Sequence, residues 1–210
     1  MSRPAGSPPL VGKESHKDYE GSKLGMWLFL FTEILLFGGL FILYSAYRAR
    51  YPLEFHDAGQ HLNVLIGVAN TVILLTSSLT VALSITAVQK GNRKLSALCL
   101  AGTIVLGLAF LVNKYIEWSA EISRGLYPNS SVLLRRPKGD QIFFGLYYSM
   151  TGLHGLHVIA GILVLSIMLV LVLRDKITST DFNKLENGGL YWHLVDVIWI
   201  FLLPLFYLAA

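Results

Sequence analysis

The stretch Gly25–Tyr47, GMWLFLFTEILLFGGLFILYSAY, decides the fold of this chain. At about 1.5 Å of rise per residue, a helix of this length extends about 34 Å, which is enough to cross a bilayer core of about 30 Å. Glu33 is the one side chain in it that is ordinarily charged at pH 7, and it lies about 12 Å from the start. A carboxylate at that depth costs several kcal/mol unless it is protonated, paired or facing the interior of a helix bundle. Glu33 is therefore the first candidate functional residue.

The composition assigns the whole chain to the polytopic membrane proteins. Of its 210 residues, 54% are hydrophobic and 14% are charged, whereas soluble domains carry about 25% charged residues. The net charge of +4 comes largely from lysines and arginines in the tail and short loops, where such residues set membrane orientation, so no nucleic-acid partner is expected. The single cysteine, Cys99, excludes an internal disulfide and a metal site built on a cysteine pair.

Five apolar runs predict an all-α bundle of five transmembrane helices. The expected spans are residues 25–47, 62–88, 95–116, 142–173 and 190–208. Residues 1–22 are polar and lack the apolar core of a secretory signal. They are expected to form a cytoplasmic tail ahead of one transmembrane domain, residues 23–210. The tail and the loops after the second and fourth spans are richer in Lys and Arg than the other two loops, which predicts a cytoplasmic N-terminus and a periplasmic C-terminus.

Two pairs of ionisable residues have helical spacing inside or beside these spans. Lys114 and Glu117 are three residues apart near the outer end of the third span, and this spacing predicts an ion pair on one helix face. His193 and Asp196 have the same spacing in YWHLVDVIW, at the start of the fifth span. A structural His–Asp contact is expected there, and a proton relay is the alternative.

A third pair, His154 and His157, lies in GLHGLHV in the outer half of the fourth span. Histidines on one helix face can bind a metal or haem. The neighbouring glycines favour close helix packing instead, with the imidazoles hydrogen-bonded across the interface. A haem held by two histidines usually takes them from two helices at matched depth, and His193 lies at the opposite end of the membrane. No metal ligand is therefore expected.

The sequence contains no motif that would carry chemistry by itself. It has no glycine-rich phosphate loop, no Ser/His/Asp arrangement, no haem-attachment motif and no paired-cysteine copper motif. We therefore expect no catalytic residue and no cofactor in this chain. Two hypotheses remain beside a non-catalytic subunit. One is a small proton-coupled transporter that uses Glu33 and the pair His193–Asp196, although the spans show no inverted repeat. The other is a b-type haem protein that uses His154, His157 or His193.

Several separated motifs resemble subunit III of the haem-copper terminal oxidases, of the cytochrome c oxidase type. They occur in the order of that family between Leu24 and Tyr207. The motifs are GMWLFLFTEILLFGGLF, LNVLIGVANTVILLTSSLTVALS followed by GNRK, KYIEW, FFGLYYSMTGLHGLHVIAG and YWHLVDVIWIFLLPLFY.

The resemblance implies a non-catalytic subunit of a proton-pumping oxidase of aerobic respiration, in a bacterial inner membrane. Such a subunit packs on subunit I, binds phospholipid, and supports sustained turnover and proton uptake on the cytoplasmic side. Haem and copper belong to partner subunits. The expected partners are subunits I and II and membrane lipids, with a small subunit IV as a further candidate.

The resemblance also assigns residues. The intramembrane acid of the family, near the subunit I interface, falls on Glu33, and a second acid falls on Glu117. His154, His157, His193 and Asp196 match its histidine and aspartate positions in the last two helices. Lipid contact is expected at Trp27, Glu33 and His193.

One departure concerns the number of helices. The long form of the family has seven helices, with lipids in a cleft between the first two and the other five. This chain has the five alone, as in bacterial forms that include the quinol oxidases. The cleft is then either open or filled by a helix of a partner. Glu33, in place of the aspartate usual in quinol-type subunits, favours the cytochrome c branch. Two roles stay open for Glu33, namely moving protons or holding an interface together.

Overall fold

The computed structural model describes residues 19–208, and all of the regular structure within that range is helical. Five helices are long and apolar enough to cross a membrane: α1 (Tyr19–Arg50), α3 (Val64–Gln89), α4 (Arg93–Ser123), α5 (Lys138–Leu173) and α6 (Asn183–Leu203), which continues into the π-helical turn η2 (Pro204–Leu208). The prediction of an all-α membrane protein with five spans is confirmed. Which end faces the cytoplasm remains a prediction.

The helices extend beyond the predicted spans because polar residues at the membrane surface continue them. Helix α1 begins at Tyr19, within the predicted tail, most of which lies outside the described residues. Helix α6 begins at Asn183, ahead of the expected Leu190. His193 and Asp196 therefore lie in the interior of a helix and not at its start. The loops also contain the short helices α2 (Pro52–Gly59) and η1 (Leu133–Arg135).

Local sequence signals explain several of the helix ends. The side chain of Asn63 accepts hydrogen bonds from the backbone N–H groups of Leu65 and Ile66, so it caps α3. Asn92 caps α4 through the N–H group of Leu95. Gly91, with φ of 72°, makes the tight turn between α3 and α4 in the left-handed conformation that glycine tolerates.

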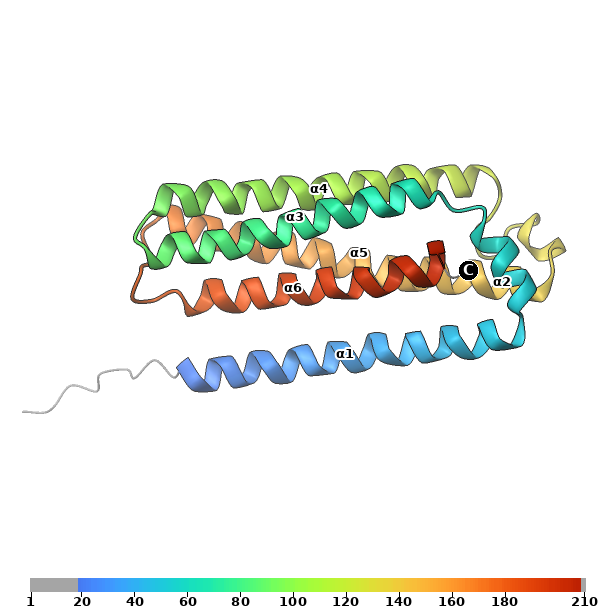
Figure 1. Cartoon of the computed structure of the whole chain (residues 1–210), viewed down its shortest axis with the longest axis horizontal. Coiled ribbons are helices and arrows are strands. Elements are labelled where there is room, and N and C mark those ends of the chain that lie inside the picture. The colour runs from blue at the N-terminus through green and yellow to red at the C-terminus, as the bar shows by residue number, and fades with distance from the viewer. Residues whose placement is uncertain (1–18, 209–210) are drawn as a thin grey trace, which may run out of the picture.

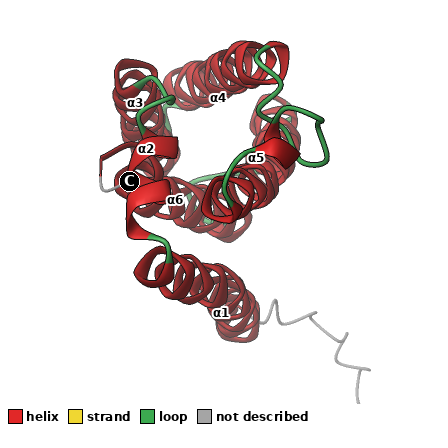
Figure 2. Cartoon of the chain, turned by 90° about the vertical axis from the view of Figure 1, so that its right-hand side faces the viewer, coloured by secondary structure: helices red, strands yellow, loops and turns green. Residues whose placement is uncertain are grey.

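Helices α3, α4, α5 and α6 form a ring in the end-on view, and α1 lies outside that ring (Figure 2). Helix α1 runs alongside α5 and α6 and is followed by α2 at the far end of the molecule (Figure 1). The turn between α3 and α4 and the loop between α5 and α6 lie at the end where α1 begins. The end that carries α2 also carries η1 and the end of α6. We call it the α2 end (Figure 1).

Large aromatic side chains fill the interior of the ring. Trp192 and Trp199 of α6 are almost completely buried. Gly107 of α4 and Gly161 of α5 make room for Trp192, because a Cβ atom at either position would lie within 2.8 Å of its ring. The packing of α6 against α4 and α5 therefore depends on missing side chains at these two positions.

Candidate functional site

The acid that the sequence singles out is tied to a histidine of another helix. Glu33 lies near the middle of α1, and its Oε2 atom is 2.9 Å from Nε2 of His157 on α5. Each side chain is 15% exposed. The ring of Phe37 meets the imidazole edge-on at 5.3 Å. The expected hydrogen bond of His157 across a helix interface is thus present, and Glu33 is its partner.

The second nitrogen of His157 fixes the number of protons in this contact, which we call the Glu33–His157 bridge. Nδ1 is 2.8 Å from the carbonyl oxygen of Leu153. A carbonyl oxygen only accepts hydrogen bonds, so Nδ1 must carry a hydrogen. If Nε2 also carries one, the imidazole is a cation and Glu33 is a carboxylate. If it does not, Glu33 must be the protonated acid that donates to it. The bridge therefore holds one proton and is neutral overall in either case.

Two apolar grooves flank the Glu33–His157 bridge between α1 and the ring of helices. The first has a volume of about 480 Å³ and is lined by Met26 and Phe29 of α1 together with residues of α5 and α6. Lys184 and Asn187 also line it. The second has a volume of about 300 Å³ and is lined only by apolar residues and Gly38. Trp27, a predicted lipid contact, is 59% exposed on α1.

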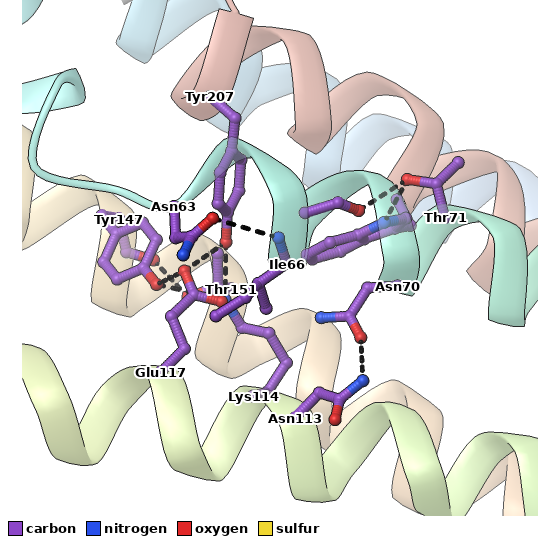
Figure 3. Close-up of polar contacts among 12 residues, drawn as sticks. Asn63, Ile66, Asn70, Thr71, Asn113, Lys114, Glu117, Tyr147, Thr151 and Tyr207 are labelled. Carbon is purple, nitrogen blue, oxygen red and sulfur yellow. Dashed lines mark hydrogen bonds and ion pairs between the residues drawn. The ribbon is translucent and has the colours of Figure 1, made fainter.

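The predicted ion pair of Lys114 and Glu117 is present and belongs to a larger buried cluster (Figure 3). The two side chains are less than 10% exposed, and their charged atoms are 3.1 Å apart. Tyr147 of α5 and Tyr207 of η2 join them. Both hydroxyls donate to Oε1 of Glu117, and both accept from Nζ of Lys114, at 3.1 Å and 3.0 Å. We call these four residues the Lys114 cluster.

Hydrogen bonding in the Lys114 cluster is complete when the lysine and the glutamate are both ionised. An ammonium group has three hydrogens, and here they have three acceptors. The Lys114 ammonium group also faces the rings of Tyr147, Trp199 and Tyr207 at 5.0 to 5.7 Å, which favours a cation further. The arrangement is a structural ion pair that joins α4, α5 and the end of α6.

Two more polar contacts join helices beside the Lys114 cluster (Figure 3). The side-chain amide of Asn113 donates to that of Asn70 at 2.9 Å, which links α4 to α3. The indole N–H of Trp199 donates to the hydroxyl of Thr71 at 3.0 Å. Sequence reasoning missed these contacts, and it also missed Tyr147 and Tyr207. The available signal was the presence of polar side-chain atoms within otherwise apolar runs.

His154 differs from its prediction. It is completely buried, with Phe110 and Trp199 against its ring at 5.6 and 5.4 Å, and neither ring nitrogen has a hydrogen-bond partner among the described residues. The expected hydrogen bond across the interface is present only for His157. The reason is the rotation of α5 about its own axis. It turns His154 toward the aromatic interior of the ring of helices and His157 toward α1.

His193 and Asp196 also differ from their prediction. Instead of contacting each other, both contact Ser78 of α3: Nδ1 of His193 lies at the hydroxyl, and the carboxyl group of Asp196 shares it. Oδ1 of Asp196 is buried and has no partner within residues 19–208. Ser78 thus separates the two side chains that helical spacing predicted to pair. In the same range, no group of three histidine, cysteine, aspartate or glutamate residues is arranged to hold a metal ion.

Comparison with known proteins gives a consistent result. The family model described as cytochrome c oxidase subunit III matches residues 7–210. Cytochrome c oxidase subunit 3 of Alkalihalophilus pseudofirmus is 33% identical over 89% of this chain and 86% of the relative. Cytochrome bo(3) ubiquinol oxidase subunit 3 of Pseudomonas aeruginosa is 27% identical over 93% of this chain and 88% of the relative. Heme-copper oxidase subunit I+III of Aeropyrum pernix is 28% identical over 95% of this chain, which spans 24% of that longer protein.

Proposed function

The chain belongs to the cytochrome c oxidase subunit III family, and from this premise we propose that it packs on subunit I, binds phospholipid and sustains proton uptake during turnover. It is a multi-pass membrane protein, in bacteria of the inner membrane, and a subunit III of a haem-copper oxidase. In this proposal the haem and copper of the oxidase lie in partner subunits. Membership of this family accounts for the same residues without a transport activity or a b-type haem in this chain.

The Glu33–His157 bridge is the observation that carries the proposal. It places a proton near the middle of α1, on the helix that is least buried by the rest of the chain. A membrane helix with so much exposed apolar surface can be covered by lipid or by a partner helix. The relative named subunit I+III joins the two subunits in one protein. This fusion supports the proposal that one face of this chain packs against subunit I.

The first groove supports phospholipid as one occupant. Met26, Phe29 and Val164 offer an apolar wall for an acyl chain, and Lys184 and Asn187 lie near the start of α6, where a head group would sit. An ammonium group near the membrane surface favours an anionic phosphate. His193, a predicted lipid contact, does not line either groove and is bonded to Ser78. We therefore propose Lys184 as the head-group contact, in place of the predicted lipid contact at His193.

The test uses the intact oxidase purified with the variant Glu33→Ala. We expect the complex to assemble with a normal haem content but to lose activity in fewer turnovers, because proton supply is impaired. Thr32→Ala is the matched control, since Thr32 is the exposed residue just before Glu33 in α1. Its hydroxyl donates to the carbonyl of Phe29 in its own helix and to no other residue in the range 19–208. A Glu33→Ala oxidase that lasts as many turnovers as the control would contradict the proposed role of the bridge.

Lipid binding is tested separately on the same complex. Native mass spectrometry of the oxidase should show fewer retained anionic phospholipids in Lys184→Gln than in wild type. Lys94→Gln is the control, because it removes a lysine at the same end of the molecule from a different surface. Equal lipid retention in the two variants would contradict the assignment of Lys184.

A further inference from the structure

Four charged residues lie along one face of the last three turns of α4. Lys114, Glu117, Glu121 and Arg124 are separated by three, four and three residues, a spacing that places them on one side of a helix. The first three are no more than 7% exposed, whereas the Arg124 side chain is 56% exposed at the α2 end. The face thus runs from the aqueous end of the bundle to the Lys114 cluster, over about 15 Å.

Glu121 is the member of this face whose hydrogen bonding is incomplete. Oε1 accepts from Arg124 at 2.8 Å. Oε2 is fully buried and has no partner among residues 19–208. Nearby, the hydroxyl of Tyr148 and the indole N–H of Trp118 are also buried and have no hydrogen-bond partner in the described part of the chain. Their rings are 5.2 Å apart. The carboxylates of Glu117 and Glu121 both act electrostatically on Tyr148.

Several features disfavour a negative charge on Glu121. It lies in the last turn of α4, at the negative end of the helix dipole. Glu117 carries a like charge one turn away, and the Lys114 ammonium group is already committed to three acceptors. Burial removes the solvent that would stabilise a carboxylate. Arg124 alone favours the ionised form, and solvent screens it because more than half of its side chain is exposed.

We propose that Glu121 is a proton-binding site that exchanges protons with water at the α2 end of the bundle. In the deprotonated state the carboxylate is paired with Arg124 through Oε1. Binding one proton from water forms an O–H bond at Oε2 and converts the carboxylate to a neutral acid. Arg124 keeps its contact with Oε1. The site therefore gains one positive charge, and Glu117 loses a negative neighbour.

The groups that face this site come from several parts of the fold. Glu117, Lys114 and Arg124 belong to α4 and its end, Tyr147 and Tyr148 belong to α5, and Tyr207 belongs to η2. Arg124 also reaches the carbonyl of His61 at 3.5 Å, and His61 lies beside Arg136 at 3.2 Å. Asp140 pairs with Arg136 at 3.4 Å. The site is separate from the Glu33–His157 bridge, and the variants that test it leave Glu33 and His157 unchanged.

The experiment is pH-difference infrared spectroscopy on the purified oxidase complex. On acidification we expect a carboxylic-acid C=O band that is present in wild type, absent in Glu121→Gln and retained in Glu20→Gln, which removes an exposed glutamate. In Arg124→Gln the same band should appear at a higher pH, because the one cation that favours the carboxylate is gone. Helix content and haem content are measured in each variant.

Three outcomes would overturn the proposal. They are a band that persists in Glu121→Gln, a wild-type spectrum without any band lost in that variant, and an Arg124→Gln spectrum whose titration does not move. If Glu121→Gln fails to assemble, the Arg124→Gln titration decides alone, because it leaves Glu121 in place and changes only the charge beside it.

Discussion

His157 is bonded at both ring nitrogens, to Leu153 of its own helix and to Glu33 of α1, so one proton is shared between a histidine and a glutamate on two of the long apolar helices. This contact lies about halfway along α1. The ends of α1 are held by Lys23 with Glu186 at 2.9 Å, and by Tyr44, whose hydroxyl donates to the carbonyl of Leu205.

The first prediction follows from that shared proton. Glu33→Gln can still donate an N–H to Nε2 of a neutral His157, so its unfolding free energy should change little. Glu33→Ala leaves a half-buried imidazole without its partner and should cost about 1–3 kcal/mol. Thermal unfolding in detergent of the two variants beside wild type measures the difference. Equal destabilisation of both variants would contradict a single-proton bridge that a neutral amide can replace.

A second prediction concerns the Lys114 cluster. Lys114→Met leaves Glu117 buried with a charge that only the two tyrosine hydroxyls contact, and this should cost about 3–5 kcal/mol. The double variant Lys114→Met with Glu117→Gln removes the uncompensated charge and should recover most of that loss. Denaturant unfolding of the single and double variants gives the coupling energy. A double variant as unstable as the sum of the two single variants would show that the two residues act independently.

A third prediction concerns pH. His61 lies in the loop before α3, and its Nε2 atom is 3.2 Å from the guanidinium of Arg136. Partial burial lowers the pKa of His61, and the nearby charges of Arg136 and Arg124 lower it further, against weaker opposing effects of Asp140 and Asp57. The folded chain therefore binds a proton less readily than the unfolded chain. Stability should fall as pH decreases below about 6.5, until the lower pKa of the folded state is passed.

The measurement is the unfolding midpoint of wild type and His61→Gln between about pH 7.5 and about pH 5. The glutamine can still accept a hydrogen bond from Arg136 but does not titrate. The wild-type midpoint should fall more steeply on acidification, by a modest amount because His61 is exposed to solvent. Identical slopes in the two proteins would contradict the assignment.

The sequence was sufficient for the features that depend on one helix at a time. Five long apolar runs predict five spans because a helix of that length satisfies all of its backbone hydrogen bonds within itself, as lipid requires. Lys114 and Glu117 pair as expected because their spacing places them on one helix face. Contacts between helices depend on how each helix is rotated, which apolar runs do not specify. His157 therefore contacts Glu33, whereas His154, three residues away, packs against the aromatic rings of Phe110 and Trp199.

Two other features escaped prediction for the same reason. Tyr207 lies at the end of an apolar run, as an aromatic of the membrane interface would. The π-helical turn that begins at Pro204 instead directs it inward to Lys114 and Glu117. Ser78 has no distinguishing pattern in a helix rich in serine and threonine, yet it separates His193 from Asp196.

The last prediction tests how tightly Trp192 is packed. A Cβ atom at Gly161 would lie 2.7 Å from Cε3 of Trp192, a contact that requires the buried indole to move. Gly161→Ala should therefore destabilise the chain by about 1–3 kcal/mol. Gly155→Ala is the matched control on the same helix, because nothing lies within 4 Å of its added Cβ atom. It should be neutral or stabilising by up to about 1 kcal/mol, since alanine favours helix over glycine. Thermal unfolding and tryptophan fluorescence of both variants make the comparison. A Gly161→Ala chain as stable as the control, with unchanged fluorescence, would show that Trp192 is free to move and that the ring of helices is packed less tightly than these distances indicate.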